Sequence, residues 1–322
     1  MRDFWRPGAA LVRWMFWGVT AALILGAALV LGPELLTRHA EEGLTVMEEL
    51  QAENEVRATL VQCLGGVVLA GGLVVTYRTF RQNRTDQDRS YELDLYSRAV
   101  EQLGHEHAPV RLGAMYSLEQ LAQVTPIRRQ NVVDVLCAYL RMPFNAPDLT
   151  KTPIDPGDQE SAQELQVRQT AQRILAAHVR RPPDTTWESA SVLAPSPSSA
   201  YWPRIKLDLT LATLWYFDLA NAVVSADFKQ ATFLGEADFH GAAFLGTADF
   251  SWATFVNSQN FSGAVFTDGV SFVGATFTAG ASFHGTRVLG DDPGLRSILP
   301  NGFVFHPDPE DPTSGTVEES AS

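Results

Sequence analysis

The sequence predicts a chain of three unlike parts: two transmembrane helices, a small all-α cytoplasmic domain, and a solenoid of short β-repeats. Three observations carry this prediction. Two uncharged apolar runs lie in the first quarter of the chain, apolar residues at helical spacing fill its middle, and phenylalanine recurs at a fixed period towards its C-terminal end. The 322 residues are enough for two or three folded units.

Residues 1–84 are predicted to form a membrane anchor. The uncharged runs cover residues 14–31 and 60–77, and each approaches the roughly 20 residues that cross the hydrocarbon core of a bilayer. A cleavable signal peptide is the alternative for the first run. Trp14 and Trp17 argue against it, as does the absence of a small-residue cleavage site before Pro33-Glu34.

The charges beside these runs predict the topology of the anchor. Arginines precede the first run and follow the second, whereas the connecting stretch is rich in glutamate. The flanking arginines are Arg2, Arg6, Arg13, Arg78, Arg81 and Arg84. Because arginines near span ends stay in the cytoplasm, both termini and everything after residue 84 are expected inside. The connecting segment is expected outside, as a solvated connector or alternatively as a sensor.

Small residues in the first run raise the question of self-association. Gly18, Ala22 and Gly26 form a row at four-residue spacing, which lets two helices approach closely. A homodimer through the transmembrane helices and packing of the two spans within one chain are both consistent with this row.

Residues 85–181 are predicted to be the helical domain. Gly104 stops its first helix, Pro109 begins a second, and Thr125-Pro126 begins a third that ends before Pro143. A fourth helix is expected over residues 159–181. The prolines and serines of residues 182–204 predict a semi-extended linker. Residues 291–322 are expected to cap the solenoid and then to continue as a disordered acidic tail.

The repeats occupy residues 205–290. Phenylalanines recur at positions 228, 233, 239, 244, 250, 255, 261, 266, 272, 277 and 283. The steps alternate between five and six residues, so the unit is eleven residues long, and alanine usually stands two positions before each phenylalanine. Neither a helical nor a strand period fits, and a fixed internal period indicates a solenoid. Trp252 stands where glycine is expected, and Gln259 and Val270 stand where alanine is expected.

Segments such as Ala226-Asp227-Phe228-Lys229-Gln230 and Ala231-Thr232-Phe233-Leu234-Gly235 resemble the pentapeptide-repeat family. With the two predicted spans, the chain looks like the membrane-anchored bacterial type of that family. The resemblance implies a right-handed quadrilateral β-helix with one pentapeptide on each side, phenylalanine and alanine inside, and glycine at corners. Together with the flanking arginines, it predicts the bacterial cytoplasmic membrane as the location, with the solenoid on the cytoplasmic side.

Asp227, Asp238 and Asp249 are the candidate interaction residues on the outer face. Each precedes a phenylalanine at eleven-residue spacing, and the sequence predicts that they stack as one acidic ladder. Asn260, Ser271 and Ser282 continue the row without charge.

Composition and motifs argue against catalysis and cofactors. The net charge of −13 disfavours direct nucleic-acid binding. His105-Glu106-His107 is the one metal-like cluster, but zinc needs three or four ligands, and Cys63 and Cys137 lie in no metal-binding spacing. No phosphate loop, nucleophile elbow or dinucleotide fingerprint occurs. We therefore expect no enzyme activity, no metal and no cofactor.

The expected role is protein–protein interaction or scaffolding at the cytoplasmic face of a membrane, with an unidentified protein as partner. The alternative is that the acidic solenoid mimics DNA and regulates a nucleic-acid enzyme such as a topoisomerase, as some pentapeptide-repeat proteins do.

Overall fold

The computed structural model describes residues 46–147, 156–289, 299–309 and 314–319. The chain divides into two compact units, Met1–Arg89 and Ser90–Ser322. The predicted span over residues 14–31, its flanking arginines and the Gly18-Ala22-Gly26 row lie outside the described residues.

The first long element is the helix α2, Val46–Leu103. It is continuous through the second apolar run and ends one residue before Gly104, the predicted stop. Large apolar side chains are exposed along the run, among them Val68, Leu69 and Leu73. Within the described parts of the chain, no helix combines the length and apolar character needed to cross a membrane.

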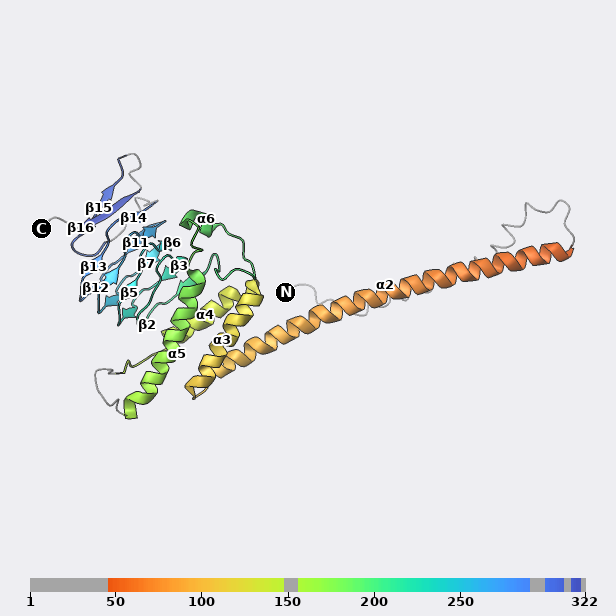
Figure 1. Cartoon of the computed structure of the whole chain (residues 1–322), viewed down its shortest axis with the longest axis horizontal. Helices are drawn as coiled ribbons and strands as arrows, with labels where there is room; N and C mark the ends of the chain where they lie inside the picture. The colour runs from red at the N-terminus through yellow and green to blue at the C-terminus, as the bar shows by residue number, and fades with distance from the viewer. Residues whose placement is uncertain (1–45, 148–155, 290–298, 310–313, 320–322) are drawn as a thin grey trace, which may run out of the picture. The chain divides into compact units, whose positions relative to one another are not determined.

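The second unit begins with a helical block, visible in Figure 1 beside the stacked strands. Its elements are the last part of α2, α3 Ala108–Val124, the 3-10 turn η1 Pro126–Arg128, α4 Arg129–Arg141 and α5 Pro156–Val179. Leu118, Leu136 and Leu175 are buried where α3, α4 and α5 pack together. A charged cluster supports this core, because Glu164 on α5 accepts hydrogen bonds from Arg111, Tyr139 and Arg168.

The repeats form a β-solenoid of about four turns with four faces per turn. The first face contains β1 Lys206–Asp208, the end of β3 Val223–Asp227, β7 Ala248–Asp249 and β11 Val270–Ser271. The second face contains β2 Thr213–Leu214, β4 Thr232–Phe233, β8 Thr254–Phe255 and β12 Thr276–Phe277.

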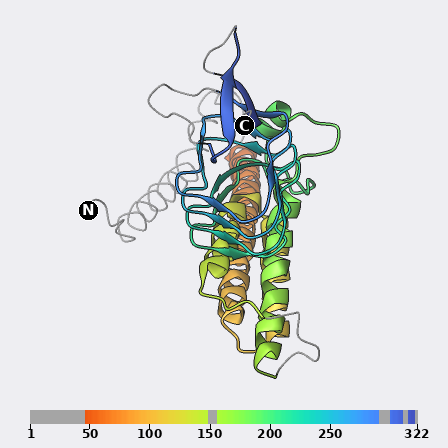
Figure 2. The same ribbon diagram turned by 90° about the vertical axis from the view of Figure 1, so that its left-hand side faces the viewer.

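The third and fourth faces complete each turn. The third contains β5 Ala237–Asp238, β9 Gln259–Asn260 and β13 Ala281–Ser282. The fourth contains the start of β3, β6 Ala243–Phe244, β10 Val265–Phe266 and β14 Thr286–Val288. Strand β3 rounds a corner and belongs to two faces. Figure 2 looks onto the C-terminal end of this stack.

The parallel register shows that one turn contains two of the eleven-residue units. Ala243 pairs with Val265, and Val265 with Arg287, which are steps of 22 residues. The first turn is shorter, since Thr213 pairs with Thr232, a step of 19. It lacks the extra corner residues of the later turns, which accounts for its less regular sequence.

The lumen is filled by stacked phenylalanine rings, as the alternation of phenylalanine and alanine predicts. Phe228, Phe250 and Phe272 stack with ring centroids 4.9 Å apart at each step, and Phe233 and Phe255 stack at 4.6 Å. These separations match the spacing of hydrogen-bonded strands, so backbone pairing and ring stacking reinforce one another. The alanines beside the rings are buried up to the last turn, where Ala275 and Ala281 are partly exposed, and larger residues have little room in the inner turns.

Gln259 replaces one of these buried alanines without leaving its amide unsatisfied. Its Oε1 accepts a hydrogen bond from the Ala237 N–H at 3.0 Å, and its Nε2 donates to the Asn257 carbonyl at 2.6 Å. Both partners are backbone groups, so the substitution is tolerated in a lumen that is mainly apolar, as is Thr286, whose hydroxyl donates to the Phe261 carbonyl.

The corners require left-handed backbone conformations, and Trp252 adopts one at a φ of +61°. The next residue in its corner column is Gly274, with a φ of +65°, and a Cβ built there would lie 2.6 Å from the Trp252 ring. Gly285, in the other glycine corner, has a φ of +68° but only a backbone nitrogen 4.0 Å away. Trp252 therefore sits directly over a glycine that cannot gain a side chain.

This contact predicts unequal costs for two alanine substitutions. Both Gly274→Ala and Gly285→Ala should lower the free energy of unfolding by roughly 1–2 kcal/mol, because alanine is strained in the left-handed conformation. Gly274→Ala should lower it further because the new Cβ would clash with the Trp252 ring. Thermal unfolding measures the difference. Adding Trp252→Gly to Gly274→Ala should remove the extra loss. Equal costs in the two single variants would contradict the contact.

The segment predicted as a linker is packed onto the second unit. Its short helix α6, Trp187–Ser191, lies beside β3 (Figure 1). Ala190 and Tyr201 are buried against Val223, Ala243 and Val265 on the outer side of the fourth face. The expectation of a semi-extended spacer missed this packing because it considered the prolines and serines of the segment alone. The outward apolar column of the fourth face needs a cover, and this segment provides it.

Trp202, at the end of this segment, is fully buried and closes it onto the helical block. Its ring stacks on His178 at 3.7 Å, its indole N–H donates to Gln123 Oε1 at 2.9 Å, and Arg129 lies over the ring. Burial lowers the pKa of Arg129, whose Nη2 donates to the Ser196 carbonyl at 2.7 Å.

The tail forms a hairpin in place of the predicted disordered segment over residues 315–319. Strands β15 Phe303–Pro307 and β16 Gly315–Glu319 are antiparallel, and β16 pairs with β14. Phe303 lies 4.6 Å from Phe283, the last ring of its column, and Val317 is buried. The hairpin therefore extends the fourth face and covers part of the end of the lumen.

Candidate interaction surface

The three candidate aspartates do not form one ladder. Asp227 pairs directly with Asp249 on the first face, whereas Asp238 pairs with Asn260 on the third face, across the coil. Eleven residues are half a turn of this solenoid, so residues at that spacing alternate between opposite faces. The predicted single acidic stripe is wrong for this geometric reason.

Each of these carboxylates also has a local task in its turn. Asp227 Oδ1 accepts from the Lys229 N–H, Asp238 Oδ1 from the His240 N–H, and Asp249 Oδ1 from the Ser251 N–H, at 2.8–2.9 Å. An aspartate or asparagine that bonds the backbone two residues on is a common way to fix a turn. Their presence before each phenylalanine is therefore explained by the fold, with or without a partner.

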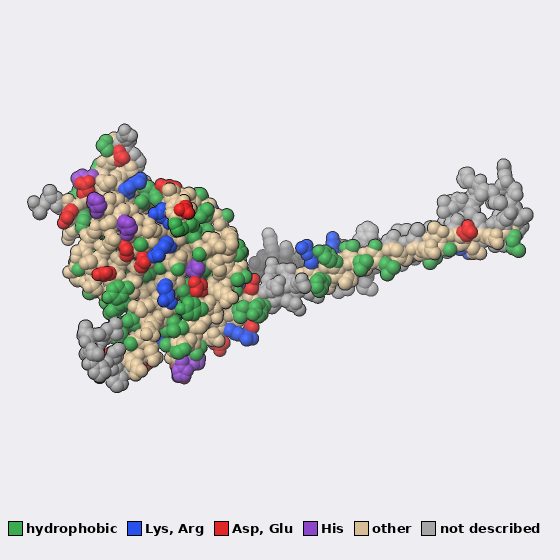
Figure 3. All heavy atoms as spheres, viewed as in Figure 1, with side chains coloured by type: hydrophobic (Ala, Val, Ile, Leu, Met, Phe, Trp, Pro, Cys, Tyr) green, Lys and Arg blue, Asp and Glu red, His purple; other side chains and the backbone are tan. Residues whose placement is uncertain are grey.

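The surface charge is mixed. On the side seen in Figure 3, acidic side chains lie among basic side chains and histidines and form no continuous patch. Two acidic groups of the first turn are paired with the helical block, Asp208 with Arg141 and Asp218 with Arg180. The aspartates that suggested DNA mimicry lie on two opposite faces of the solenoid and not in one row.

The second face is different, because its outward positions carry no charge. One column consists of Thr213, Thr232, Thr254 and Thr276, which pair in register from turn to turn. The neighbouring column consists of Trp215, Leu234, Val256 and Thr278. This face offers a flat surface of methyl, hydroxyl and apolar groups.

Large apolar side chains of the solenoid are exposed mainly along the borders of this second face. Leu211 and Trp252 are 62% and 59% exposed at its border with the first face, and Tyr216 is 63% exposed at its border with the third. All three have positive φ, at 63°, 61° and 54°. The exposed bulk therefore stands at corner positions where glycine would be unstrained.

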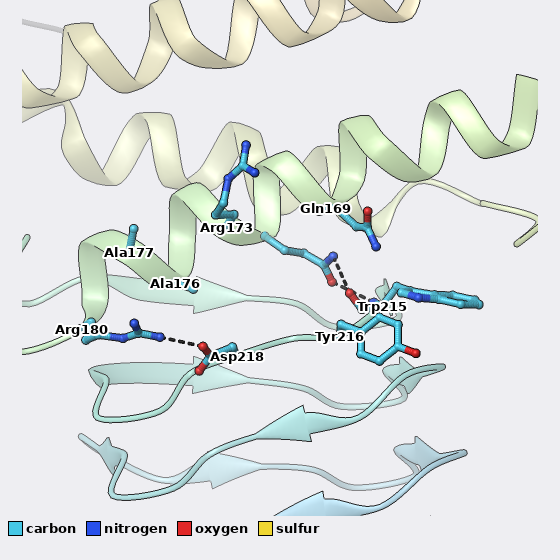
Figure 4. Close-up of a pocket in the computed structure, with 9 residues that line it drawn as sticks. Gln169, Arg173, Ala176, Ala177, Arg180, Trp215, Tyr216 and Asp218 are labelled. Carbon is cyan, nitrogen blue, oxygen red and sulfur yellow. Dashed lines mark hydrogen bonds and ion pairs between the residues drawn. The ribbon is translucent and has the colours of Figure 1, made fainter.

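Two adjoining hollows lie on either side of Tyr216. One, of about 370 Å³, lies between α5 and the first turn, and the other, of about 450 Å³, lies along the third face. Both are lined by Tyr216 and Asp218. Figure 4 shows Arg180, the residue that follows α5, pointing to Asp218 in the lining of the first hollow, and their side chains form an ion pair at 2.7 Å.

The backbone at this site is fixed to α5. Gln172 accepts from the Trp215 N–H at 2.9 Å and donates to the Trp215 carbonyl at 3.2 Å. Gly235 lies beneath Tyr216, and a Cβ at Gly235 would lie 2.7 Å from the Tyr216 nitrogen. Trp215 and Tyr216 were missed in the sequence, although a signal was present, because two adjacent bulky aromatics stand at outward positions of the first turn.

The metal-like cluster and Cys137 do not form a metal site within the described residues. The rings of His105 and His107 are 5.1 Å apart in an exposed turn, and His105 Nδ1 accepts a backbone hydrogen bond from His107. Burial raises the pKa of Cys137 to about 12, so its thiol stays protonated. No three His, Cys, Asp or Glu side chains converge as metal ligands within the described residues.

Comparison with known proteins agrees with this geometry. Residues 241–287 match the pentapeptide-repeat family, with nine copies of the repeat. No curated protein and no solved structure matches the chain. The four-faced coils and the stacked phenylalanines define a β-solenoid, and its part over residues 241–287 is similar to the pentapeptide-repeat family.

Proposed function

We propose that this protein is an interaction or scaffolding module that holds a protein partner on the second face of its solenoid and acts without catalysis. The observation that carries the proposal is the set of exposed bulky residues at left-handed corners, Leu211, Tyr216 and Trp252. A residue other than glycine in this conformation costs about 1–2 kcal/mol. Exposed side chains at such positions contribute little to the lumen, so a contact with another molecule is their most direct use.

The composition of this surface supports a protein partner. Tyrosine and tryptophan are enriched among the residues that dominate binding energy in protein interfaces, and the centres of interfaces are depleted in charge. The uncharged second face between the Trp252 and Tyr216 borders fits both descriptions. A partner with a flat apolar surface would cover it.

The corner residues allow a test in which binding is lost and stability is kept. Trp252→Gly and Leu211→Gly remove apolar surface and at the same time relieve the left-handed backbone. We expect unchanged or slightly higher thermal stability and a loss of most partner labelling by a proximity-labelling enzyme fused to the full chain. Lys229→Ala, on the first face, is the matched control and should label normally. Undiminished labelling in both glycine variants would overturn the proposal.

We also propose that the module is tethered to the bacterial cytoplasmic membrane through residues 14–31 and 60–77, with both termini and the solenoid on the cytoplasmic side. The support is the arginine distribution around the two runs and the exposed apolar side chains of α2, including Val68, Leu69 and Leu73. An apolar helix surface of this kind is stable in lipid.

Cysteine accessibility in intact cells tests the tether. In a Cys63→Ala background, Met47→Cys should react with a membrane-impermeant maleimide, because residue 47 lies between the two runs. Ser189→Cys, on the exposed side of α6, should react only after the cells are opened. Reaction of both cysteines in intact cells, or release of the chain by a carbonate wash, would contradict the tether.

A further inference from the structure

We propose that the groove formed by the two hollows around Tyr216 binds an arginine-bearing basic segment of the partner protein. The inference rests on the proposed interaction function and adds the chemistry of the partner. The groove runs from α5 along the third face, and its two hollows have volumes of about 370 and 450 Å³. Together they offer room for a few side chains of an extended peptide.

The charge of the second hollow sets the sign of its occupant. In the first hollow Arg180 pairs with Asp218, and Arg173, a second cation in its lining, donates to the Tyr116 hydroxyl. Glu236 and Asp238 line the second hollow, and within the described residues neither has an ion pair. Asp238 uses Oδ1 for its turn and for the Asn260 side chain at 3.1 Å, and its Oδ2 makes no hydrogen bond to the part of the chain that the structure describes. The second hollow therefore carries two uncompensated negative charges, and a cationic side chain complements it.

Tyr216 favours arginine over lysine among cationic side chains. Its ring is 63% exposed between the two hollows, and the paired Gln172–Trp215 hydrogen bonds hold its backbone in place. A planar guanidinium stacks on an aromatic face and can bond a carboxylate with two parallel N–H groups, whereas an ammonium is a more strongly hydrated point charge. An arginine over Tyr216 with Glu236 and Asp238 nearby would use both properties.

The neighbouring residues are built around this ring. Gly235 lets the Tyr216 backbone approach closely, since a Cβ at Gly235 would lie 2.7 Å from the Tyr216 nitrogen. In the later turns the same corner has an extra residue and carries no aromatic side chain. The arginine site is therefore particular to the first turn, where the solenoid meets α5.

The test is binding of labelled peptides to the full-length chain in a mild nonionic detergent. The probes are fluorescein-labelled arginine–glycine, lysine–glycine and glutamate–glycine repeats of equal length, followed by fluorescence anisotropy at physiological salt. We expect the arginine peptide to bind more tightly than the lysine peptide, and the glutamate peptide not to bind.

Two charge-matched variants locate the site. The double variant Glu236→Gln with Asp238→Asn should lower the affinity for the arginine peptide by roughly tenfold or more, because two charge-assisted contacts are lost. Asp227→Asn with Asp249→Asn removes the same charge from the opposite face and should change the affinity by no more than about twofold. Asparagine keeps the Oδ1 that closes each turn, so both pairs should fold.

Tyr216 provides the second arm. Tyr216→Phe should preserve the preference for arginine, and Tyr216→Gly, which also relieves a φ of +54°, should abolish it. The proposed arginine site would be overturned if the two charge-matched pairs lowered the affinity for the arginine peptide equally. It would also be overturned if Tyr216→Gly still preferred arginine over lysine. Such a failure is distinguishable from failure of the proposed function, because Trp252→Gly and Leu211→Gly change neither hollow and test the second face independently.

Discussion

Phe250→Asp should unfold the solenoid. Phe250 is fully buried, stacks on Phe228 and Phe272 at 4.9 Å, and meets Phe239 and Phe261 edge-on. Loss of a buried phenylalanine alone costs about 3–5 kcal/mol, and an unpaired carboxylate in a lumen lined by phenylalanine and alanine adds a further penalty. The total is comparable to the whole stability of a typical domain, which is ~5–15 kcal/mol.

The loss should be visible as disappearance of the β-sheet signal in circular dichroism and as protease sensitivity. Phe250→Leu is the matched control, because Leu209 fills the corresponding position of the first turn and is also fully buried. It should cost far less than the aspartate. Lys229→Ala, which replaces an exposed side chain of the same face, should leave the stability of the solenoid nearly unchanged. A folded Phe250→Asp protein would show that the phenylalanines do not fill the lumen.

Trp202→Ala should cost about 3–5 kcal/mol and release the segment that covers the fourth face. The indole is fully buried, stacks on His178, and donates to Gln123, so its removal leaves a cavity and unpairs the Gln123 carbonyl. Hydrogen exchange should accelerate over residues 187–202 and on the outer side of β3 and β6. Trp187→Ala, at the half-buried start of α6, is the milder control.

A variant with a lowered melting temperature but unchanged exchange over residues 187–202 would contradict the role of Trp202 as a clasp. Such a result would restore the semi-extended linker that the prolines and serines of this segment suggested. The experiment therefore measures directly whether the helical block and the solenoid are held together by this segment.

The repeat itself was readable because it depends on local spacing. Phenylalanine at a step of five or six residues, with alanine two positions earlier, indicates a solenoid that buries the rings, and the resemblance to the pentapeptide-repeat family implies its four faces. The corner glycines follow from the same repeat, whereas the turn role of the aspartates was seen only in the structure. The residues that break the repeat, Trp252 in place of glycine and Gln259 in place of alanine, could also be recognised in the sequence. The contacts that they make could not.

The placement of residues on faces could not be read in the same way. An eleven-residue spacing looks like a ladder in the sequence, but it alternates between opposite faces once two units make one turn of 22 residues, as in Ala243, Val265 and Arg287. The register between turns is a tertiary fact, because it depends on which backbone groups pair across 22 residues. For that reason Asp227 and Asp249 lie together and Asp238 does not.

The sequence by itself determined the solenoid, its lumen and the helices before it, since each of these follows from short-range periodicity and from glycine and proline punctuation. Only the tertiary structure decided that residues 187–202 cover the fourth face, that bulky side chains border the second, and that Tyr216 stands between two hollows. These features depend on contacts between residues far apart in the chain, such as Gln172 with Trp215 and Gln123 with Trp202. No local pattern records such contacts, because the packing free energy that selects them exists only after the helices and coils have formed.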